Sequence, residues 1–145
     1  MNIVVILFAF NFKFLYMCVC VCVCLCDEKV SDEILEFWFE GSTSDNVKRR
    51  WFLATGSAEQ AAFDARVCEK YGATLESALT GAFDVEARRS ARGTLALVVL
   101  LDQLSRHIHR SAPERLVACD ERAVALTRHA LDVIACISLC ARVVV

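Results

Sequence analysis

The segment that most constrains the fold of this chain runs from Leu95 to Arg110 (LALVVLLDQLSRHIHR), where an apolar run changes abruptly into polar and charged residues. Seven consecutive apolar residues, Leu95 to Leu101, would surround a helix for two turns, whereas a helix at a protein surface carries a polar stripe. We therefore predict that this segment belongs to a central, enclosed helix that extends from about Ala87 to Ile108.

The polar end of this helix supplies the candidate site, which consists of Asp102, Gln103, Arg106 and Arg110. Asp102, Arg106 and Arg110 follow one another at i, i+4 steps on one helix face, so we predict that they pair with each other. Two interpretations are open. The cluster is either an ionic lock between helices, or a pocket in which the two arginines bind an anion or a peptide terminus and Asp102 orients them.

Composition favours one helical domain. The chain has 145 residues, of which 57% are hydrophobic, with one proline and five glycines. No stretch before Ile134 alternates convincingly between apolar and polar residues, and the linkers are short, so we predict an all-α fold of antiparallel helical hairpins. A net charge of −2 without a basic cluster argues against nucleic acid as a partner.

Residues 1–26 differ from the rest of the chain. They hold one charged side chain, Lys13, and are long enough to cross a membrane as an anchor. Five of the nine cysteines alternate with Val or Leu between Cys18 and Cys26, which is the pattern that a repeated TG dinucleotide encodes. We therefore interpret residues 1–26 as a low-complexity extension of the gene model, with a membrane anchor as the alternative if they are translated.

Turn and capping residues predict the helices before the central one. Ser31 is expected to cap a short helix that ends at Gly41, and a second short helix is expected over residues 47–53. Ser57 is expected to cap a long helix over residues 58–79, which Gly81 ends, and residues 82–86 then lead into the central helix. The apolar stripe of the long helix consists of Phe63, Val67, Tyr71, Leu75 and Leu79.

After the central helix, Pro113 marks a break, and a final helix is expected from Arg115 or Asp120 to Leu131. We divide the rest of the chain into a helical domain over residues 27–132 and an unrelated, β-prone apolar tail over residues 133–145. Outside the Cys18–Cys26 tract, Cys68, Cys119, Cys136 and Cys140 are expected to be free buried thiols of a cytoplasmic protein.

Several motifs resemble one protein family. FWFE at Phe37–Glu40, RWF at Arg50–Phe52, AAFDARVCEKYG at Ala61–Gly72 and the Leu95–Arg110 segment, followed by a helix around Asp120, are similar to the bacterial-type domain of unknown function 924. The resemblance covers Ile34 to about Asp132 and implies an all-helical, tetratricopeptide-like right-handed array without an established biochemical role.

The chain departs from that family in three respects. Leu104-Ser105 replaces the usual Phe-Pro, His107 replaces Asn, and the family continues for several helices where this sequence ends, so the resemblance implies a domain truncated at its C-terminus.

We expect a binding scaffold without catalysis, metal or cofactor, with a peptide or small anion as ligand and a protein or peptide as partner. One alternative is a small-molecule enzyme that uses Asp102 and His107, and another is a truncated product without function.

Overall fold

The computed structural model describes residues 29–39 and 53–143, and the side chains of this part except those of Glu86 and residues 135–143. The described residues form helices and turns without a strand, which confirms the predicted all-α class. In chain order the elements are α3 (Lys29–Phe39), α5 (Ala58–Leu79), α6 (Asp84–Arg89), α7 (Ala91–Val98), the π-helical turn η2 (Val99–Leu104), α8 (Ser105–Ile108), the 3₁₀ turn η3 (Pro113–Arg115) and α9 (Leu116–Val143).

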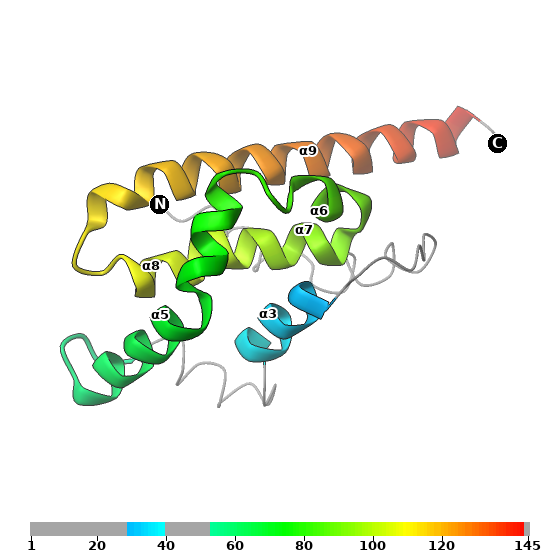
Figure 1. Ribbon diagram of the computed structural model, residues 1–145. Helices are drawn as coiled ribbons and strands as arrows, with labels where there is room; N and C mark the ends of the chain where they lie inside the picture. The colour runs from blue at the N-terminus through cyan, green and yellow to red at the C-terminus, as the bar shows by residue number, and fades with distance from the viewer. Residues whose placement is uncertain (1–28, 40–52, 144–145) are drawn as a thin grey trace.

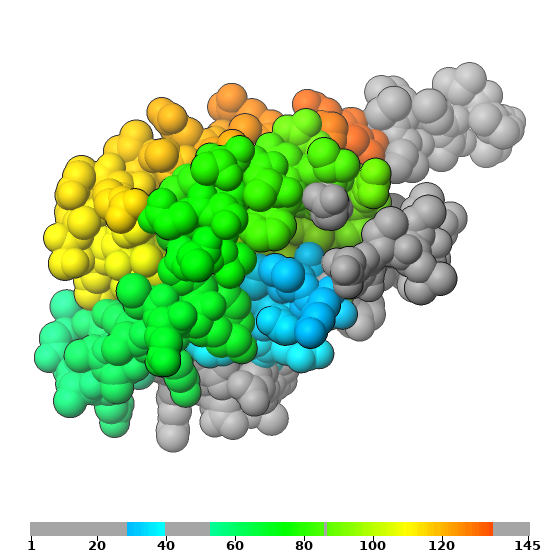
Figure 2. Space-filling model, viewed as in Figure 1, coloured from blue at the N-terminus to red at the C-terminus, as the bar shows by residue number. Residues whose placement is uncertain are grey.

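The centre of the molecule is the nearly continuous rod formed by α7, η2 and α8, which packs against α3, α5 and α9. Figure 1 shows α9 running antiparallel to this rod along one side, with α5 crossing it and α3 next to α7. Residues Ala96 to Leu101 are all buried, as the apolar run predicted. The space-filling view shows that α5 covers much of one face of the rod (Figure 2).

The long helix α5 begins and ends where capping residues predicted. The Ser57 hydroxyl accepts a hydrogen bond from the Gln60 backbone N–H at 3.1 Å, which satisfies one of the free donors of the first turn. Gly81 has a φ of +88°, a backbone conformation that favours glycine, and so ends the helical path. Phe63, Val67, Tyr71 and Leu75 of the predicted stripe are buried, and the Tyr71 ring packs against Phe37 of α3.

Three helix boundaries differ from the prediction. The first helix already includes Lys29, so Ser31 lies within it rather than capping it. The segment expected to be a connector forms α6, and the backbone of Ser90 is extended (φ −138°, ψ 144°), which separates α6 from the rod. The Ser90 hydroxyl then accepts from the Gly93 backbone N–H at 2.9 Å and caps α7.

The C-terminal tail is the clearest correction. We predicted a final helix ending at Leu131 and a β-prone tail, but α9 continues as one helix from Leu116 to Val143. Once a helix is established, each further residue adds a hydrogen bond without the cost of a new nucleus, and this outweighs the weak strand preference of valine and isoleucine.

Two other predictions lie outside the described residues, namely the low-complexity segment 1–26 and the short helix over 47–53, except for its last residue, Leu53, which is not helical. The tetratricopeptide-like, right-handed arrangement stays a prediction. In the part of the chain that the structure describes, no helix combines the length and the apolar character needed to span a membrane.

Candidate functional site

The four predicted site residues do not form one ladder but belong to two clusters. The Arg106 cluster consists of Asp102, Gln103, Arg106 and Asp120, and the Asp64 cluster consists of Asp64, His107 and Arg110. The predicted pairing of Arg110 with Asp102 and Arg106 is wrong. Helix α8 ends at Ile108, and His109 has a non-helical backbone (φ −105°, ψ 26°), so the chain leaves the helix before Arg110.

In the Arg106 cluster, one guanidinium nitrogen serves two helices. Nη2 of Arg106 donates to Asp102 at 3.0 Å and to Asp120 of α9 at 2.8 Å. The other carboxylate oxygen of Asp102 accepts from the amide nitrogen of Gln103. Asp102 is buried, so its charge depends on these partners. The predicted pair of Asp102 and Arg106 is therefore confirmed, and Asp120 extends it to α9.

The local backbone positions Asp102 within η2. The Ser105 backbone N–H donates to the carbonyl of Leu100, five residues earlier, and the Ser105 hydroxyl donates to the carbonyl of Leu101 at 2.6 Å. In an α-helix the Leu101 carbonyl would accept a hydrogen bond from the Ser105 backbone N–H. Here it accepts from the Ser105 hydroxyl instead. This exchange accounts for the wider π-helical turn around Asp102.

In the Asp64 cluster, a carboxylate of α5 binds two side chains at the end of α8. Asp64 accepts from Nε of Arg110 and, at 3.1 Å, from Nη2, and its Oδ1 lies 2.7 Å from Nδ1 of His107. An ionised carboxylate is only a hydrogen-bond acceptor. The ring proton of His107 is therefore on Nδ1, which donates a hydrogen bond to Asp64. Nε2 of His107 is then the acceptor atom of the ring, and within the described residues it makes no hydrogen bond.

Burial and charge set the protonation of this cluster in opposite ways. Burial lowers the pKa of His107 below its ordinary value, Arg110 lowers it further, and the hydrogen bond and charge of Asp64 oppose this shift. Burial raises the pKa of Asp64, but the hydrogen bonds and charges of Arg110 and His107 together outweigh it and lower that pKa. At neutral pH the cluster therefore holds a charged carboxylate, a charged guanidinium and a neutral imidazole.

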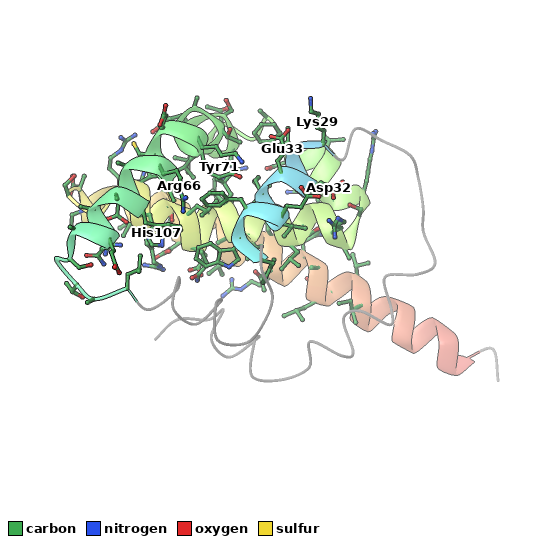
Figure 3. The ribbon with its side chains drawn as sticks, turned by 90° about the horizontal axis from the view of Figure 1, so that it is seen from below. Lys29, Asp32, Glu33, Arg66, Tyr71 and His107 are labelled. Atoms are coloured by element: carbon green, nitrogen blue, oxygen red, sulfur yellow. The ribbon has the colours of Figure 1, made fainter. Side chains whose placement is uncertain are left out.

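Aromatic rings surround His107. Its ring centroid lies 4.9 Å from that of Phe63 in an edge-on arrangement and 6.2 Å from that of Trp38, which is buried. Figure 3 labels His107 where the rod passes α5, the helix that carries Asp64 and Phe63. These contacts fix the ring and connect the cluster to the packing between α3 and α5.

Asp102 and His107, the pair considered for an acid–base reaction, lie in separate clusters with different partners. Sequence analysis missed Asp64 as a member of the site. Asp64 directly follows Phe63 and precedes Val67 by three positions, so it lies at the border of the apolar stripe of α5. A charged residue beside an apolar stripe indicates that the charge has a partner in the fold. The sequence did not show that the partners of Asp64 are His107 and Arg110, more than forty residues away.

The thiols and metal-binding groups add little to the site. Cys119 is buried and free as predicted, whereas Cys68 is exposed. Burial raises the pKa of the Cys119 thiol, which keeps it in the unreactive protonated form. Among the residues that the structure describes, no three His, Cys, Asp or Glu side chains are grouped to hold a metal ion. The side chains of Cys136 and Cys140 lie outside this description.

Comparison with known proteins gives one match. The chain matches the model of a family described as bacterial protein of unknown function (DUF924) over residues 34–140, which extends past Asp132, where the sequence resemblance was expected to end. The searches of curated proteins and of solved structures found no match. Because the matched region covers most of its length, the chain belongs to the DUF924 family of bacterial proteins of unknown function.

Proposed function

We propose that this chain is a helical binding domain without catalysis, and that it recognises a peptide terminus or another small anion through Arg110. The observation that carries this proposal is the orientation of the Arg110 guanidinium by Asp64. Nε and Nη2 of Arg110 bind the carboxylate side-on, and Nη1 makes no hydrogen bond within the described residues.

The exposure of Arg110 supports a binding role. Its side chain is 42% exposed, so the remaining donors can meet a ligand. An arginine plane that is already held on one edge loses little conformational entropy when a second carboxylate binds at its free end. Asp64 thus plays the orienting role that the sequence analysis gave to Asp102.

For Asp102, Gln103 and Arg106 we propose the ionic lock, the other of the two interpretations. Nη2 of Arg106 is shared by two carboxylates, and Nε of Arg106 is buried and has no hydrogen-bond partner in the part of the chain that the structure describes. A ligand anion there would have to compete with Asp102 and Asp120 for the same guanidinium. This arrangement favours a structural connection between the rod and α9 over a binding role.

The proposal is tested with the acetylated peptide ALFA, once with a free C-terminal carboxylate and once amidated, by thermal shift of the full chain. We expect the melting temperature to rise with the concentration of the free-acid peptide, because only a ligand of the native state stabilises it. The amidated peptide and the variant Arg110→Gln should give no such rise.

The matched control is Arg115→Gln, which also removes an exposed arginine, here one that pairs with Glu76 at 2.6 Å. This variant should respond to the free-acid peptide like the unmodified chain. Equal shifts for the free and amidated peptides, or an unchanged response of Arg110→Gln, would contradict the proposal.

A further inference from the structure

One oxygen of Asp64 is shared by an imidazole and a guanidinium that also contact each other. Oδ1 of Asp64 lies 2.7 Å from Nδ1 of His107 and 3.1 Å from Nη2 of Arg110. Those two nitrogens lie 3.2 Å apart. A change in the charge of His107 therefore takes place in direct contact with the group that is proposed to bind the ligand.

The charges of the Asp64 cluster balance at neutral pH. Asp64 carries a negative charge, Arg110 carries a positive charge, and the imidazole of His107 is neutral. Protonation of His107 at Nε2 adds a second positive charge, while the cluster still holds a single carboxylate. An anion bound to Arg110 supplies the missing negative charge, so the proton and the anion each favour the binding of the other.

The burial of this cluster strengthens the link between proton and ligand. The side chains of His107 and Asp64 are 13% and 17% exposed, whereas that of Arg110 is 42% exposed. Solvent and salt screen charges weakly where side chains are mostly buried. The ligand therefore reaches the cluster at Arg110, and the proton acts on it from the buried side.

Within the described residues, Asp64 of α5 and Arg110 are the groups whose charges shift the pKa of His107. Arg66 of α5 and the preceding residue Arg106 are arginines, which keep their charge at all of the pH values considered. The other neighbours of His107 on α3 and α5 are uncharged rings, those of Trp38 and Phe63. The proton on His107 is thus the variable charge of the cluster in mildly acidic solution.

We infer that the anion site at Arg110 is regulated by pH through His107, and that it binds its ligand more tightly in mildly acidic than in neutral solution. This inference rests on the proposed function and adds a regulation to it. His107 acts without touching the ligand, because it changes the charge next to the guanidinium. Burial lowers the pKa of His107 from its ordinary value of 6.5, and a bound anion offsets part of that effect.

The test measures the binding of the acetylated free-acid peptide ALFA to the full chain by isothermal titration calorimetry. We expect the Kd to be about fivefold lower at about pH 5.5 than at about pH 7.5, because the peptide carboxylate is charged at both and His107 is not. In His107→Gln the Kd should be the same at both pH values. A glutamine amide can still donate to Asp64 but takes up no proton.

A second measurement needs no variant. Titrations at about pH 6 in two buffers that differ in their enthalpy of ionisation give the number of protons taken up on binding. We expect a net uptake by the unmodified chain. The matched control is His109→Gln, which removes the other buried histidine. The charges that act on His109 are Arg115, Glu76 and Glu114 rather than Asp64, so H109Q should keep the tighter binding at low pH.

The same Kd at both pH values in the unmodified chain, the absence of proton uptake, or a pH effect that H107Q retains would overturn the regulation. Loss of the effect in H109Q to the same extent as in H107Q would do so as well. If the amidated peptide and R110Q still fail to bind in these cases, the proposed function stands without it. If the free-acid peptide binds the unmodified chain at neither pH, both proposals are wrong.

Discussion

Asp102 and Asp120 accept hydrogen bonds from the same nitrogen of Arg106, at 3.0 and 2.8 Å, although one lies in η2 and the other on α9. Their surroundings differ. The side chain of Asp102 is 10% exposed and that of Asp120 is 44% exposed. Two ion pairs of similar geometry are therefore expected to differ in their contribution to stability, because solvent screens one of them.

Replacing the buried carboxylate should be the costly change. Asp102→Ala leaves Arg106 without its partner in the rod, and we expect the free energy of unfolding to fall by about 2 to 4 kcal/mol. Asp120→Ala should lower it by less than about 1 kcal/mol. Urea denaturation followed by circular dichroism measures both values, and equal losses would contradict the difference in burial.

Coupling between Asp102 and Arg106 provides an independent check. Each single replacement leaves a charge without its partner, so the double variant D102A/R106A should lose much less stability than the sum of the single variants. Additive losses would mean that the two groups do not act as a lock.

Stability should decrease on acidification in two ranges. The pKa of His107 is lowered by burial, so below about pH 6.5 the unfolded chain binds a proton that the folded chain resists, and the free energy of unfolding falls. The pKa of Asp64 is lowered by Arg110 and His107 against the effect of burial, so its contribution is present above pH 3.8 and is lost as pH falls through its folded pKa.

Burial also lowers the pKa of His109, so both histidines contribute to the first range with the same sign. His107→Gln should reduce the slope of stability against pH between about pH 5 and 6.5 without removing it, because His109 still contributes. Chemical denaturation at closely spaced pH values measures this slope. An identical slope in H107Q would show that His107 does not titrate differently in the two states.

Two glycine-to-alanine replacements should act in opposite directions. Gly81 has a φ of +88°, which an alanine adopts with strain, so Gly81→Ala should cost about 1 kcal/mol. Gly72 lies inside α5, and a β-carbon there would meet no atom within 4 Å, so Gly72→Ala should stabilise the chain by about 0.5 to 1 kcal/mol. Thermal denaturation of both variants tests the pair.

The cap of α5 gives a further measurable value. Ser57→Ala removes the acceptor of the Gln60 backbone N–H and should cost about 1 kcal/mol. Ser77→Ala is the matched control, because the Ser77 hydroxyl bonds within an exposed turn of the same helix, to the carbonyl of Ala73. It should change stability by less than about 0.5 kcal/mol. A smaller effect of S57A than of S77A would contradict the capping role.

The parts of the fold that could be predicted from the sequence are those set by local patterns. The apolar run Leu95–Leu101 predicted the enclosed rod, and Ser57 and Gly81 predicted the limits of α5. In each case the cause is a property of a few neighbouring residues, such as an apolar circumference, a capping hydroxyl or a positive φ. The spacing of Asp102 and Arg106 likewise predicted their ion pair.

What could not be predicted depends on where distant segments meet. The partner of Arg110 is set by the end of α8 at Ile108 and by the position of α5, which bring Asp64 within reach. Asp120 joins the Arg106 cluster because α9 returns along the rod. The tail was mispredicted because its valines and isoleucines favour strand. The tail instead extends the helix that begins at Leu116, so the preceding helix sets its conformation.

The π-helical turn Val99–Leu104 has a consequence for the evolution of this region. Such a turn holds one residue more than an α-helical turn, so it behaves like a single-residue insertion within a helix. Loss of one residue there would restore ordinary helical bonding and turn the following segment by about 100° about the rod axis. Arg106 and His107 would then face away from Asp120 and Asp64. The number of residues between Val99 and Leu104 is therefore as constrained as their identity.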